Sequence, residues 1–273
     1  MNKLYIILIL ISFVSNINAN DKLSFHARKN VNIEEPPYTK SDIEAEIVFG
    51  RELASKLTGR YGLYKDVNLN KYINKVGKNL ARFSTRPELD FKFAVLDTDE
   101  INAYACPGGY IFVTKGALKK MKNESELAGV LAHEIAHVSQ RHIVKELEIR
   151  GKDQNSITSI LSASGANAAK AMSKMVDEAF DTLLSTGLKD HKYEYESDRL
   201  ATFLIYNTGY DTTSFYKFLE RVSKDTKHLQ VVSKTHPSFQ SRIEKLKKLN
   251  KVNHLSDEQL KKLKERFEKN VKL

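Results

Sequence analysis

The chain has 273 residues, of which 41% are hydrophobic and 29% charged, and its formal net charge is +10. That length and apolar content are sufficient for one globular domain with a hydrophobic core. The single cysteine, Cys106, excludes an internal disulfide and is expected to be a small buried residue rather than a nucleophile. No nucleic-acid-binding motif accompanies the positive charge, so we expect no nucleic-acid partner. Peripheral contact with an anionic membrane surface stays open.

The first forty residues have the composition of a leader and a linker. A basic start at Lys3, an apolar run from Leu4 to Val14 and a small residue at Ala19 predict a secretory signal peptide over residues 1–19. The apolar run is short for a membrane span, and an uncleaved signal anchor is the alternative. Residues 20–40 are polar and predict a flexible lead-in.

Two amphipathic helices and three strands are expected next. The capping box Ser41-Asp42-Ile43-Glu44 begins the first helix, and apolar positions from Leu69 to Leu80 form the second. Alternation with a period of two predicts strands at residues 91–96, 101–106 and 110–114.

Pro107-Gly108-Gly109 joins the last two strands as a hairpin or tight bend, which predicts a small antiparallel sheet. A free strand edge carrying Asn102, Ala103 and Tyr104 would hold an extended peptide by backbone hydrogen bonds. The alternative is that these strands only cap the core.

The segment His133-Glu134-Ile135-Ala136-His137 carries the clearest chemical signal. Asn123 and Glu126 predict the start of a helix, so His133 and His137 share one face with an axial rise of about 6 Å. Two imidazoles at this spacing can close on one Zn²⁺, and Glu134 beside them can take a proton from a water activated by the metal. The alternative is a helix with two surface histidines, which the apolar flanks disfavour. The helix is expected to run to about Arg150.

A second acidic stretch offers the third metal ligand. Glu194 and Asp198 are four residues apart and share a helix face. Glu194 can complete a set of two histidines and one glutamate, while Asp198 can accept a hydrogen bond from the outer N–H of a ligand histidine. A charged, exposed helix start is the alternative. His142 is a rival ligand, but it would point about 180° away from His133 on a continuous helix, so we expect it to be structural.

Four motifs in this order resemble the HExxH metallopeptidase family that includes the CAAX prenyl proteases, HtpX, BepA and LoiP. They are Asn102 to Ile111; His133 to His137 with Arg141-His142; Glu194 to Asp198; and Thr235-His236-Pro237 with Arg242. The resemblance covers about Ser41 to Ile243. We therefore assign residues 41–250 to a zinc metallopeptidase domain and residues 251–273 to a basic C-terminal helix.

The resemblance implies an α+β fold, a mostly helical zincin domain of the gluzincin type with one small antiparallel sheet. It implies one Zn²⁺ per chain held by His133, His137 and Glu194. Glu134 would be the general base, Asp198 a support for the ligands, His236 an inhibitory fourth ligand and Arg242 a substrate or oxyanion contact. Residue 197 is serine where the family usually has alanine, a departure that should not disturb the ligand.

The implied function is a zinc-dependent endopeptidase acting on misfolded or misassembled envelope proteins. The chain is most similar to small, stand-alone periplasmic members such as LoiP, so secretion across the inner membrane is expected. One alternative is a chaperone-like protein that binds unfolded clients while His236 blocks a latent peptidase site. Another is a structural zinc site without catalysis.

Overall fold

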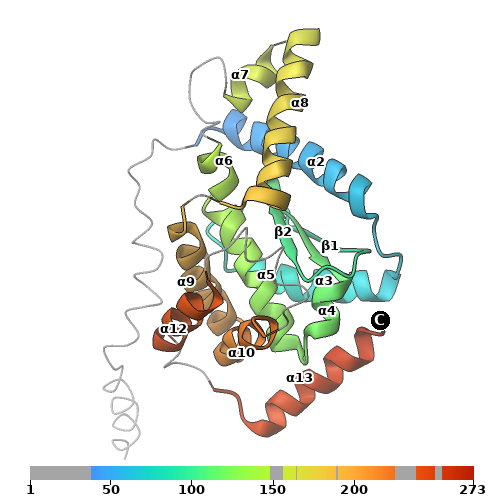
Figure 1. The fold of residues 1–273 in the computed structure, drawn as a ribbon, viewed down its shortest axis with the longest axis vertical. Helices are drawn as coiled ribbons and strands as arrows, with labels where there is room; N and C mark the ends of the chain where they lie inside the picture. Colours follow the sequence, from blue (N-terminus) through green and yellow to red (C-terminus); the bar gives the residue numbers. More distant parts are fainter. Residues whose placement is uncertain (1–37, 148–155, 164, 189, 225–237, 250–253) are drawn as a thin grey trace, which may run out of the picture. The chain divides into compact units, whose positions relative to one another are not determined.

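The computed structural model describes residues 38–147, 156–163, 165–188, 190–224, 238–249 and 254–273 (Figure 1). The predicted signal peptide, most of the lead-in, His236 and the expected helix end near Arg150 lie outside these residues. Within them the fold is α+β and mostly helical, as expected. None of the described helices combines the length and the apolar character that a membrane span requires.

The helices are bounded as follows. They are α2 (Lys40–Tyr61), α3 (Val67–Ala81), α4 (Lys115–Lys120), α5 (Glu124–Ser139), α6 (His142–Glu146), α7 (Ile157–Ser162), α8 (Ala166–Asp181), α9 (Lys192–Asn207), α10 (Thr212–Val222), α12 (Phe239–Leu249) and α13 (Asp257–Asn270), with a 3₁₀ turn η2 (Pro107–Gly109) and a π-helical turn η3 (Thr182–Thr186). The capping box of α2 is formed by Thr39 with Asp42, two residues before the expected one. Ser256 and Gln259 form the capping box of α13.

The sheet is mixed, so the expectation of an antiparallel sheet is wrong for one of its two pairs. Strands β1 (Lys92–Leu96), β2 (Ala103–Cys106) and β3 (Tyr110–Thr114) lie in the order β1-β3-β2. The η2 turn makes β2 and β3 an antiparallel hairpin, but β1 pairs with β3 in parallel. Alternation of side chains reveals a strand without revealing the direction of its neighbour. Nothing in that pattern could therefore have identified the parallel pair.

The sheet separates two apolar clusters. Alternate strand residues, among them Phe93, Ile111 and Val113, pack with α3, α5, α9 and α10 on one face. Tyr104, Phe112 and the fully buried Cys106 pack on the other face with α2, α7 and α8. Burial raises the pKa of the Cys106 thiol, in keeping with its expected role as a buried apolar residue. Helix α5 consequently lies in the interior, between the sheet and α9 (Figure 1).

Helix α5 ends earlier than the sequence predicts. Its last residue is Ser139, and Arg141 adopts a left-handed conformation, with φ 56° and ψ 39°, before α6 begins at His142. A non-glycine residue there carries a steric cost, so the surroundings must hold it. The Arg141 Nε donates to Glu46 Oε2 at 3.0 Å, and its guanidinium lies 3.4 Å from the ring centroid of Tyr38. The expected continuous helix is therefore wrong, because the backbone breaks at Arg141 between α5 and α6.

Candidate metal centre

Helix α5 brings the two motif histidines together inside the protein. The side chain of Asn123 caps the helix by accepting from the backbone N–H of Glu126 at 3.0 Å. Every residue of α5 is buried, because the helix lies between the sheet and α9. The Nε2 atoms of His133 and His137 lie 3.0 Å apart, so the two imidazoles converge on one point. The alternative of two surface histidines is excluded.

Helix α9 contributes the carboxylate of Glu194 to the same point. Its oxygens lie 3.4 Å from Nε2 of His133 and 3.2 Å from Nε2 of His137, and its side chain is 2% exposed. Ligand atoms of these three residues all lie within 4.8 Å of one another. A buried set of two imidazoles and one carboxylate fits a divalent transition metal with an open position, and these residues could hold one.

Asp198 lies directly behind His133, one turn after Glu194 on α9. Its Oδ1 is 3.0 Å from Nδ1 of His133, the ring nitrogen that faces away from the metal-ligand set. Arg242 on α12 donates to both oxygens of Asp198, at 2.9 and 2.7 Å, and its Nη1 lies 3.0 Å from Glu194 Oε2. All three side chains are almost completely buried. The geometry fits the expected support of a ligand histidine by Asp198.

His142 faces the centre as well, which the sequence reasoning missed. Its Nδ1 lies 2.9 Å from Nδ1 of His137, and its side chain is fully buried. Burial lowers the pKa of His142 below its usual value. The prediction that this histidine points away assumed a continuous helix, whereas the left-handed residue Arg141 redirects it. No glycine marks that break, so the sequence gives no local signal for it.

The pKa values of His133 and His137 are shifted in opposite directions. Burial and the nearby Arg242 lower the pKa of His133, but hydrogen bonds with Asp198 and Glu194 outweigh them and raise this pKa to about 9. Burial lowers the pKa of His137 to about 3, although Glu194 opposes the shift. When no metal is bound, these shifts favour a proton on His133 over one on His137. A metal must displace it, because a ligand histidine binds as the neutral imidazole.

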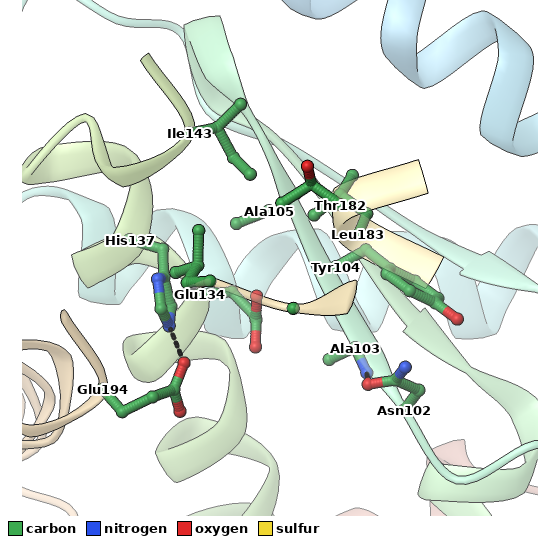
Figure 2. Close-up of a pocket in the computed structure, with 12 residues that line it drawn as sticks. Asn102, Ala103, Tyr104, Ala105, Glu134, His137, Ile143, Thr182, Leu183 and Glu194 are labelled. Carbon is green, nitrogen blue, oxygen red and sulfur yellow. Dashed lines mark hydrogen bonds and ion pairs between the residues drawn. The ribbon is translucent and has the colours of Figure 1, made fainter. Parts of the chain in front are cut away.

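A cleft opens between the centre and strand β2 (Figure 2). Glu134 is 7% exposed and directs its carboxylate into the space between the His137–Glu194 pair and β2. The cleft is lined by Asn102, Ala103 and Tyr104, and by Thr182 and Leu183 of η3, which lie beside Tyr104 in Figure 2. The expected edge-strand residues thus border the same cleft as Glu134.

Arg242 is buried against the carboxylates of the centre. Its side chain is 4% exposed and contacts the carboxylates of Glu194 and Asp198. It is absent from the residues that line the described part of the cleft. The expected substrate or oxyanion contact stays a prediction. The observed contacts favour a role in holding the two carboxylates.

A buried His-Glu-x-x-His pair, a carboxylate from a second helix and a cleft along an edge strand form an arrangement typical of metallopeptidases. The chain belongs to peptidase family M48, whose family model matches residues 68–250. This confirms the family resemblance that the four motifs indicate.

Three relatives illustrate the range of the family. The chain is 29% identical over 209 residues to the beta-barrel assembly-enhancing protease of Escherichia coli (strain K12), covering 74% of this chain and 43% of that protein. It is 28% identical over 181 residues to the mitochondrial metalloendopeptidase OMA1 of Schizosaccharomyces pombe, covering 64% and 51%. It is 25% identical over 210 residues to the metalloprotease YcaL of Escherichia coli (strain K12), covering 77% and 81%. The chain spans less than half the length of the first of these relatives.

Proposed function

We propose that the chain is a zinc-dependent endopeptidase with one Zn²⁺ held by His133, His137 and Glu194. The observation that carries this proposal is the convergence of three buried ligand groups beside Glu134, at the wall of a cleft. Two histidines and one glutamate form a known ligand set of catalytic zinc, which leaves one position open for water and substrate.

The chemistry divides between the metal and Glu134. A bound zinc ion supplies a Lewis acid that polarises the scissile carbonyl and activates the attacking water. Glu134 accepts the proton of that water as its oxygen bonds to the carbonyl carbon, and then delivers the proton to the leaving amine as the C–N bond breaks. Asp198 keeps the His133 ring oriented through Nδ1, so that Nε2 faces the metal.

We place the substrate along β2. This strand lies at one edge of the sheet, and the backbone N–H of Thr114 on β3 donates to the carbonyl of Asn102 at 3.1 Å. Because successive residues of a strand direct their backbone groups to opposite sides, those of Ala103 and Ala105 face the other edge. The side chain of Asn102 accepts from the N–H of Ala103 at 2.9 Å, and an extended peptide would replace this contact.

The proposal also covers the substrates of the enzyme and the cellular compartment in which it acts. We propose misfolded or misassembled envelope proteins as substrates and the periplasm as the location. The secretory pattern of residues 1–19 supports this setting, as does the name of the beta-barrel assembly-enhancing relative. Sequencing the N-terminus of the protein purified from fractionated cells would test the leader. A protein that is found in the cytoplasm with residues 1–19 still attached would contradict the periplasmic location.

The test of the function is cleavage of unfolded casein with zinc supplied, comparing the wild-type chain with Glu134→Gln. We expect Glu134→Gln to retain one zinc per chain and to lose cleavage, because the change removes the base and none of the ligands. Glu52→Gln, an exposed change on α2, is the matched control and should cleave like the wild type. His236→Ala is assayed in parallel to reveal an inhibitory fourth ligand.

Two results would contradict the proposal. Cleavage that persists in Glu134→Gln would exclude this residue as the base. A wild-type chain that takes up no zinc, measured by atomic absorption after dialysis, would exclude the metal site. Zinc uptake without cleavage by the wild type and by His236→Ala, with client binding retained, would favour the chaperone-like alternative.

A further inference from the structure

The outer nitrogens of the two motif histidines face different partners. Nδ1 of His133 lies against the carboxylate of Asp198, whereas Nδ1 of His137 lies 2.9 Å from Nδ1 of His142. The rings of His137 and His142 meet edge to face, with centroids 4.9 Å apart and an interplanar angle of 81°. A second imidazole thus occupies the position where ligand histidines usually have a carboxylate, carbonyl or water.

The protonation of this pair follows from the geometry and rests on the proposed zinc site. If Nε2 of His137 binds the metal, its proton must be on Nδ1. Among the described residues, Nδ1 of His142 lies within hydrogen-bond distance of that N–H, and accepting it requires the proton of a neutral His142 to be on Nε2. Glu196 Oε2 lies 3.4 Å from this Nε2, which is close enough for an electrostatic contact but makes no hydrogen bond in the structure.

His142 is held in this orientation from three directions. Its ring stacks on Tyr193 with centroids 4.5 Å apart and an interplanar angle of 25°. The hydroxyl of Ser197 lies 3.4 Å from its Nδ1, farther away than His137. The left-handed turn at Arg141 directs the residue back toward α5, and Glu46 holds this turn through Arg141.

Glu46 is itself fixed in the interior. It accepts from both terminal nitrogens of Arg86 at 3.1 Å, and the backbone N–H of Gly108 donates to it at 3.3 Å. Glu46 and Arg86 are each 3% exposed, and Arg86 also reaches the carbonyl of Val138 at 3.5 Å. The turn that presents His142 is therefore bound to a buried ion pair rather than left to solvent.

We infer that His142 is a positioning residue for the metal centre. It accepts the Nδ1 proton of His137, fixes the tautomer and ring orientation that the metal requires, and is oriented in turn by Glu196. Helix α9 then supplies a partner for each half of the site: Asp198 behind His133, and Glu196 behind His142 and His137.

The first test uses zinc affinity, measured by chelator competition on metal-stripped protein. His142→Leu fills much of the same space without an acceptor, and we expect it to weaken zinc binding roughly 10–100-fold. His142→Asn carries its amide oxygen near the position of Nδ1, and we expect it to recover most of the loss. The exposed His254→Leu is the control that should bind zinc like the wild type.

The second test needs no substitution. In the zinc-loaded wild type with ¹⁵N-labelled histidine, an N–H···N hydrogen bond gives a scalar coupling between the Nδ1 atoms of His137 and His142. We expect that coupling, with the proton assigned to His137. Its absence would overturn the inference even if His142→Leu fails to fold.

The outcomes separate this inference from the proposed function. A wild-type chain without zinc affinity overturns both. Zinc binding that is unchanged in His142→Leu overturns the inference alone. A His142→Asn variant as weak as His142→Leu also overturns it, because space filling rather than hydrogen bonding would then explain the effect.

Discussion

The guanidinium of Arg242 lies against two carboxylates that belong to the metal centre. It pairs with Asp198 through two nitrogens and with Glu194 through the third, and all three side chains are buried. In the metal-free protein this arginine and the proton on His133 offset two buried negative charges. A bound divalent cation adds positive charge at the same place, so the need for Arg242 should depend on the metal.

Arg242→Met should destabilise the metal-free protein more than the zinc-loaded protein. Breaking a buried ion pair costs about 3–5 kcal/mol, because the remaining carboxylates lose their partner. The measurement is urea denaturation in chelator and in excess zinc. Arg51→Met, which alters an exposed pair with Glu52, is the control and should change little in either condition. Equal losses with and without zinc would show that Arg242 acts independently of the metal.

At the scale of elements, α2 approaches the η2 turn closely at Gly50. A Cβ on Gly50 would lie 1.7 Å from the carbonyl oxygen of Pro107. This close approach brings Glu46, one turn earlier on α2, to the N–H of Gly108. The packing of two backbones at Gly50 therefore helps to place the ion pair that holds the end of α5.

Gly50→Ala should lower the free energy of unfolding by about 1–3 kcal/mol, since backbone atoms must move apart to admit the methyl group. Gly59→Ala on the same helix meets nothing within 4 Å and is exposed. It should instead raise stability by about 0.5–1 kcal/mol through helix propensity. Chemical denaturation of both variants checks the pair. If Gly50→Ala and Gly59→Ala changed the free energy of unfolding by similar amounts in the same direction, the close contact between Gly50 and Pro107 would be contradicted.

The sequence predicted elements better than it predicted their ends and neighbours. Capping residues and apolar spacing located α3, α5 and α13, and the motif spacing identified His133, His137 and Glu194 as residues that the fold brings together. The parallel pairing of β1 and the end of α5 could not be predicted. Both depend on contacts distant in sequence, such as Glu46 with Arg141.

At the scale of the whole molecule, Glu124 joins three helices at the start of α5. Tyr72 of α3 and Tyr210 donate to its carboxylate at 2.9 and 2.6 Å, and Arg266 of α13 also pairs with it. Phe267, the neighbour of Arg266, is 4% exposed and belongs to the same apolar cluster as α3 and α5. The C-terminal helix is therefore part of the core packing, whereas its basic residues lie on the outside.

Phe267→Ala should reduce the free energy of unfolding by about 3–5 kcal/mol, because it removes a buried aromatic ring. Zinc affinity of the folded fraction should stay close to that of the wild type, since the proposed ligands lie further along α5 and on α9. Thermal unfolding and chelator competition measure the two quantities. Leu273→Ala, at an exposed position, is the control. A Phe267→Ala protein as stable as the wild type would mean that α13 does not anchor the fold.

Three acidic side chains at alternate positions of α9, Glu194, Glu196 and Asp198, face the histidines of the centre. Because all three lie on one helix, the rotation of α9 about its axis decides whether these carboxylates reach the histidines. One residue inserted within α9 before Glu194 would turn all three by about 100° at once. An insertion or deletion inside α9 before these residues would therefore displace the three carboxylates together, whereas a change of length in a connecting loop would leave their spacing on α9 unchanged.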